Sequence, residues 1–93
     1  MITRQVRIGS QAGLHARPAT ILVQTVQRSG AVVTIAREGE EPVRADSVLS
    51  LMTAGIRYGE LVTLSAEDDN GPVLDELAAL LREDLDQHSQ AEN

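Results

Sequence analysis

Gly13-Leu14-His15-Ala16-Arg17-Pro18-Ala19-Thr20 is the stretch where a polar loop gives way to the first strongly periodic segment of the chain. Pro18 suits the first turn of a helix, where its missing N–H would have had no intrahelical partner. Gly30 suits the other end, because glycine adopts the left-handed cap conformation at little cost. Between them, apolar residues recur at the three- and four-residue spacing of one buried helical face: Ala19, Leu22, Val23 and Val26. The sequence therefore predicts a helix that begins next to His15 and ends at Gly30.

His15 is expected at the N-cap of this helix, where unpaired backbone N–H groups and the helix dipole favour an anion. Imidazole changes readily between nucleophile, base and acid near neutral pH. A phosphoryl group on a ring nitrogen would meet the N–H groups of Ala16 and Arg17, and the Arg17 guanidinium would add a charge-assisted contact. The alternative is a polar histidine that only caps the helix. No metal-ligand partner lies at a useful spacing, so no metal site and no cofactor are predicted.

Composition limits the kind of protein this can be. Ninety-three residues make one domain, and with 42% apolar residues but a single aromatic, Tyr58, its core must be aliphatic. There is no cysteine, which is compatible with a reducing cytoplasm. No long apolar run suggests a signal peptide or a membrane-spanning helix.

The net charge of −6 divides unevenly: residues 1–37 carry five arginines and no acid, whereas residues 38–93 carry a net charge of −11. The overall sign argues against nucleic acid, and no basic cluster indicates a membrane surface. A basic rim around His15 would steer acidic protein partners toward it. The alternative is that the charges only keep a small domain soluble.

The remaining elements follow from periodicity. Alternation and β-branched residues predict strands at residues 2–8, 31–36 and 61–66, with a short edge strand at residues 42–45. A last helix begins near Pro72, with N-cap acceptors among Asp68, Asp69 and Asn70, and its leucine stripe is core. The domain is expected to span residues 1–88, including His88, and to be followed by a frayed polar tail at residues 89–93. The order β-α-β-β-α-β-α indicates an α+β fold with helices on one face of an antiparallel sheet.

A second informative segment is residues 46–55. Ser47 is a good N-cap for a short helix that Gly55 ends. The apolar residues of this helix cannot all face inward, so some of Val48, Leu49 and Met52 are expected to be exposed beside His15 as a docking patch. The alternative is a short helix that is simply buried.

The motif at residues 13–20 resembles the phosphorylation site of the HPr family, the histidine-containing phosphocarriers of the bacterial sugar phosphotransferase system. The resemblance extends over nearly the whole chain. It implies an open-faced β-sandwich, four antiparallel strands covered on one face by three helices, and a cytoplasmic, monomeric carrier without turnover of its own. By resemblance, His15 accepts a phosphoryl group from phospho-enzyme I and passes it to EIIA components of sugar permeases. Arg17 and the backbone of Ala16 and Arg17 would stabilise the phosphate.

The resemblance also implies that Thr20, Ile21, Val48, Leu49 and Met52 contact partners. Ser47 matches a serine that many Gram-positive members phosphorylate for regulation, which would add an HPr kinase/phosphorylase or a transcriptional regulator as partners. Asp46 and Ser50 depart from the family pattern, where a basic residue and a glycine are common.

Three other functions fit the same residues. One is a regulatory docking module without phosphotransfer, although His15 argues against the family branch that lost this histidine. Another is an HPr paralogue for nitrogen regulation or for a dihydroxyacetone kinase. The third is a ligand-binding domain of the split β-α-β class.

Overall fold

The computed structural model describes residues 1–14 and 16–83. His15, His88 and the expected tail at residues 89–93 lie outside the described residues. The elements, in chain order, are β1 (Ile2–Arg7), α1 (Ala16–Ser29), β2 (Thr34–Arg37), β3 (Val43–Arg44), α2 (Val48–Ala54), β4 (Leu61–Ala66), the 3₁₀ turn η1 (Asp68–Asn70) and α3 (Gly71–Arg82).

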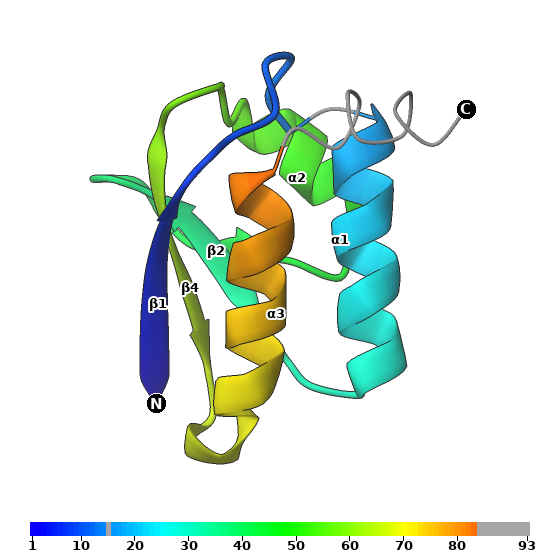
Figure 1. Cartoon of the computed structure of the whole chain (residues 1–93), viewed down its shortest axis with the longest axis vertical. Helices are drawn as coiled ribbons and strands as arrows, with labels where there is room; N and C mark the ends of the chain where they lie inside the picture. Colours follow the sequence, from blue (N-terminus) through cyan, green and yellow to red (C-terminus); the bar gives the residue numbers. More distant parts are fainter. Residues whose placement is uncertain (15, 84–93) are drawn as a thin grey trace.

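The strands of this part of the chain form one sheet in the order β1-β4-β2-β3, and every neighbouring pair is antiparallel. β1 pairs along its whole length with β4, from Ile2 opposite Ala66 to Arg7 opposite Leu61. The helices α1, α2 and α3 lie on one side of the sheet (Figure 1). The predicted α+β open-faced sandwich is confirmed.

The core lies between the sheet and the helices. Side chains from alternate strand positions, such as Val6 and Leu64, meet the apolar faces of the helices, and the neighbours of these two residues along the strands are polar. Because the chain has one aromatic residue, the largest fully buried side chains are almost all aliphatic; they are Ile8, Leu22, Ile35, Leu51, Leu64, Leu74, Leu77, Val26, Val33, Val62 and Pro18.

The start of one strand and the capping of one helix differ from the sequence-based expectation. The strand expected from residue 31 begins at Thr34, because residues 30–33 carry the chain from the end of α1 to the sheet, with Gly30 at φ = 73°. The last helix begins at Gly71, next to Pro72 as expected, after the 3₁₀ turn η1. Asn70 occupies its N-cap position but makes no side-chain cap hydrogen bond, so the expected role of Asp68, Asp69 and Asn70 as cap acceptors is wrong.

Arg4 occupies a position of β1 that alternates with Val6 and so would place a charge on the inward face of the strand. Its guanidinium instead lies at the rim of the helix layer, where Nε donates to Asp75 Oδ1 of α3 at 2.7 Å. The charge is thus paired at a partly exposed edge rather than buried.

Candidate functional site

The loop between β1 and α1, residues 8–14, is fixed by backbone contacts to two distant segments. The N–H of Gly9 donates to Leu81 O of α3 at 2.8 Å, and the N–H of Leu14 donates to Ile56 O at 3.0 Å. Gly13 turns the chain at φ = 78°, a conformation that favours glycine, and Leu14 is buried. The residue before His15 is therefore anchored in the core, although His15 itself lies outside the described residues.

The first turn of α1 combines an anchored side with an exposed side. Pro18 and Ala19 are buried, whereas Ala16 and Arg17 are exposed. Thr20 is exposed too, and its hydroxyl donates to Ala16 O at 2.7 Å. The helix N-terminus thus faces solvent beside Arg17, and the N-terminal N–H groups of a helix together with a cation attract an anion.

The short helix α2 has the caps that its sequence predicts. Ser47 Oγ accepts from the N–H of Ser50 at 3.2 Å, and Gly55 closes the helix at φ = 70°. Leu51 is completely buried, while 77% of Leu49 and 45% of Met52 are exposed. The expectation that the apolar residues of this helix divide between core and surface is confirmed in the geometry.

The structure brings the two predicted segments together. α2 packs against α1, and Ile56, just beyond the end of α2, accepts the hydrogen bond from Leu14 described above. Val48 is half-buried, as is Ile21 of α1. The exposed faces of Leu49 and Met52 therefore belong to the part of the molecule that carries residues 13–20.

Ser47 is half-buried and its hydroxyl already serves as the helix cap. The neighbouring Asp46 carboxylate accepts from Arg44 Nη2 at 2.7 Å, in a partly exposed ion pair. A basic neighbour thus compensates the acid that departs from the family pattern, and Arg44 offsets part of the negative charge beside Ser47.

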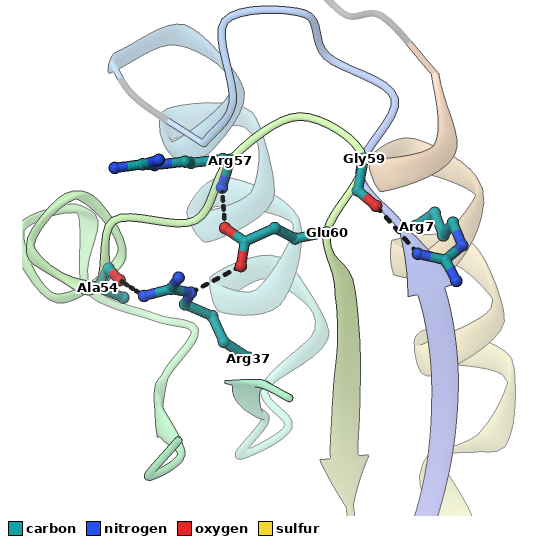
Figure 2. A network of polar contacts seen from close by, with 6 residues as sticks. All are labelled: Arg7, Arg37, Ala54, Arg57, Gly59 and Glu60. Carbon is teal, nitrogen blue, oxygen red and sulfur yellow. Dashed lines mark hydrogen bonds and ion pairs between the residues drawn. The ribbon is translucent and has the colours of Figure 1, made fainter. Parts of the chain in front are cut away.

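The turn at residues 56–60 lies outside the two segments that the sequence indicates as sites, and it takes part in the network of polar contacts in Figure 2. The Glu60 carboxylate accepts from the backbone N–H of Arg57 at 2.7 Å and from Arg37 Nε at 2.9 Å. Arg37 also donates to Ala54 O, at the end of α2. The N–H of Arg57, with the Arg37 guanidinium beside it, holds the pKa of Glu60 below its ordinary value of 4.5. The one feature of the sequence that points to this turn is Tyr58, the single aromatic residue of the chain.

Neither a metal-binding cluster nor a helix able to span a membrane is found in the part of the chain that the structure describes. Residues 1–14 and 16–83 contain no group of three or more His, Cys, Asp and Glu side chains able to hold a metal ion. Among the same residues, no helix has both the length and the apolar character needed to cross a bilayer.

Comparison with known proteins agrees with this fold. The family model "PTS HPr component phosphorylation site" matches residues 2–83. Phosphocarrier protein HPr of Streptomyces coelicolor is 38% identical over 88 residues, 94% of this chain and 95% of that protein. HPr-like protein Crh of Bacillus subtilis is 34% identical over 86 residues, 91% of this chain and 100% of that protein. The crystal structure of HPr from Bacillus anthracis has a TM-score of 0.78 at 30% identity, over 86% of this chain and 95% of that one. The chain belongs to the HPr family of phosphocarrier proteins of the phosphotransferase system.

Proposed function

We propose that this protein carries a phosphoryl group on His15, taking it from phospho-enzyme I and passing it to EIIA components during phosphoenolpyruvate-dependent sugar uptake. A ring nitrogen of His15 forms the N–P bond with its lone pair as the bond from phosphorus to the donor breaks. Transfer to the acceptor reverses these roles, so the carrier ends unchanged. It is a carrier without turnover of its own.

The observation that carries this proposal is the motif at residues 13–20 on an anchored, solvent-facing helix start. Within this motif, Leu14, Pro18 and Ala19 are buried, whereas Ala16 and Arg17 are exposed to solvent. A carrier must present its phosphoryl group to two proteins in turn, and phosphoryl transfer depends mainly on positioning and charge stabilisation. We assign the stabilisation to Arg17 and to the backbone N–H groups of Ala16 and Arg17.

The docking surface in this proposal consists of Thr20 and Ile21 of α1 with Val48, Leu49 and Met52 of α2. Leu49 and Met52 supply exposed apolar area of the kind found at protein interfaces. A carrier has to leave one partner to reach the next, so we expect weak and transient complexes and a monomer acting in the cytoplasm.

Two histidines in the chain allow a matched test. The protein is incubated with enzyme I and labelled phosphoenolpyruvate as wild type, His15→Ala and His88→Ala. We expect acid-labile, alkali-stable label on wild type and His88→Ala and none on His15→Ala, with all three equally folded by circular dichroism. Label that persists on His15→Ala contradicts the assignment of the site.

Regulation through Ser47 is a second candidate, favoured by the likeness to Crh of Bacillus subtilis, which is 34% identical and whose solved structure is described as that of the catabolite repression HPr. A phosphate on Ser47 would place about two negative charges at the start of α2, beside the apolar docking surface, and would repel an acidic partner. An HPr kinase/phosphorylase would supply it, and a transcriptional regulator would read it. Tight binding to such a regulator that does not depend on phosphohistidine would favour this role over sugar transport.

Carrier variants that serve nitrogen regulation or a dihydroxyacetone kinase use the same chemistry at His15. Measuring transfer from the phosphorylated protein to purified EIIA and to a dihydroxyacetone kinase separates these variants. Membership of the HPr family favours all of them over the ligand-binding alternative.

A further inference from the structure

The turn at residues 56–60 exposes an arginine and the only aromatic side chain of the protein at its apex. Tyr58 is 59% exposed, and Arg57 is exposed beside it. Tyrosine and arginine, with tryptophan, are enriched among the residues that dominate binding energy at protein interfaces.

The backbone of this turn is rigidly held. The N–H of Gly59 donates to Ile8 O at 2.8 Å, and the N–H of Ile8 donates to Glu60 O at 3.0 Å. Arg7 Nη1 donates to Gly59 O at 3.1 Å, and the Glu60 carboxylate receives the N–H of Arg57 (Figure 2). A binding element fixed in advance loses less conformational entropy when a partner docks on it.

The turn adjoins the loop that leads into the phosphorylation motif. Leu14 is hydrogen-bonded to Ile56, and a β-carbon on Gly13 would lie 3.2 Å from the Cα of Arg57. The Arg37 contact with Ala54 O ties the same network to the end of α2. A protein that approaches both residues 13–20 and the exposed face of α2 therefore meets this turn.

The charge around the turn is positive. Within residues 1–14 and 16–83, the guanidinium of Arg57 makes no hydrogen bond or ion pair, and it extends away from Glu60 (Figure 2). Arg7 and Arg17 are exposed on the neighbouring segments. The carboxylate in the turn, Glu60, is occupied by Arg37 and by the N–H of Arg57.

We propose that Arg57 and Tyr58 form a third part of the docking surface, an anchor for a partner that presents carboxylates around an apolar patch. This inference rests on the proposed function, since the partner is the protein that exchanges the phosphoryl group with His15. Arg57 pairs with a carboxylate of the partner, and the Tyr58 ring packs against its apolar patch. The two residues change binding and not the chemical step.

The test uses enzyme I as the partner and compares two double variants of the full-length protein. Arg57→Gln/Tyr58→Ala removes the anchor. Arg28→Gln/Val32→Ala removes an exposed arginine and an exposed apolar side chain near the opposite end of α1, about 18 Å along the helix axis from its start. Both are compared with wild type for Kd by titration calorimetry, for KM and kcat of labelling by phosphoenolpyruvate, and for urea stability.

We expect Arg57→Gln/Tyr58→Ala to raise Kd and KM about tenfold at low salt, with kcat unchanged and a weaker salt dependence of Kd. Arg28→Gln/Val32→Ala should stay within about twofold of wild type. Equal values for the two double variants, with wild type labelled, overturn the anchor alone. Absence of label on wild type overturns the proposed function together with it. If the urea midpoint of the anchor variant falls, Arg57→Gln alone, which removes no packed group, must still raise KM about threefold.

Discussion

The substitution Gly13→Ala, which adds a single methyl group, tests how the loop at residues 8–14 is held in place. The backbone of Gly13 lies at φ = 78°, and a β-carbon there would be 2.6 Å from the carbonyl oxygen of Ile56. Gly39, in the turn between β2 and β3, has almost the same dihedral, φ = 80°, but a β-carbon there meets nothing within 4 Å. Gly13→Ala and Gly39→Ala therefore share the cost of the left-handed backbone conformation. Only Gly13→Ala adds a steric overlap, with the carbonyl oxygen of Ile56.

The left-handed conformation costs an alanine roughly 1–2 kcal/mol, partly offset in both variants by the lower entropy of the unfolded chain. At Gly13 the Ile56 carbonyl must also move, which disturbs the hydrogen bond from Leu14 N at 3.0 Å and the bond from Gly13 N to Ser10 O at 2.9 Å. Each such bond contributes about 1 kcal/mol net. We expect losses of about 3 kcal/mol for Gly13→Ala and about 1 kcal/mol for Gly39→Ala.

Urea denaturation followed by circular dichroism measures both losses, and thermal unfolding gives a second reading. The melting temperature should fall by about 12–24 °C for Gly13→Ala and about 4–8 °C for Gly39→Ala. Because residues 13–20 contain the proposed phosphorylation site, Gly13→Ala should also slow labelling by enzyme I, whereas Gly39→Ala should not. Equal destabilisation by the two variants would refute the reasoning, since it would mean that the contact with Ile56 does not constrain the loop.

Two further predictions concern α2 and the turn at residues 56–60. Ser47→Ala removes the oxygen that accepts from Ser50 N and should lower the free energy of unfolding, measured by urea denaturation, by about 1 kcal/mol. Ser47→Asp keeps an acceptor and should recover most of that stability. Equal losses for both variants would show that Ser47 does not stabilise the protein as a helix cap. Glu60→Gln should destabilise the protein at pH 7, because the lowered pKa of Glu60 means that the folded state favours the carboxylate. That stabilisation is complete above the ordinary pKa of 4.5 and is lost as the pH falls through the lower folded value, so the melting temperatures of wild type and Glu60→Gln should converge in acid. A difference that stays constant with pH would exclude the ionised carboxylate as its source.

Local patterns predicted most of the fold. The spacing of apolar residues marked α1, and Ser47 and Gly55 marked both ends of α2, because caps and helical faces depend on residues only a few positions apart. The sequence predicts a strand that starts three residues before β2 does, since β-branched residues favour extended backbone whether or not a neighbouring strand is there to pair with.

Contacts between distant segments could not be predicted in this way. Nothing near Glu60 in the sequence shows that its carboxylate meets Arg37, and nothing near Gly9 shows that a β-carbon there would overlap the carbonyl oxygen of Arg82. The surroundings of the candidate site consist of such contacts. The motif at residues 13–20 could be found from the sequence, whereas the turn beside it required the structure.

The pairing of β1 with β4 has a consequence for the order of events at the ribosome. Residues 2–7 find their strand partner only in residues 61–66, and the N–H of Gly9 finds its acceptor only at Leu81. The segment ahead of residues 13–20 therefore leaves the ribosome before the segments that hold it in place. We expect the segment that leads into residues 13–20 to stay unfixed until α3 has left the ribosome, so a partner that recognises the folded surface binds only after that point.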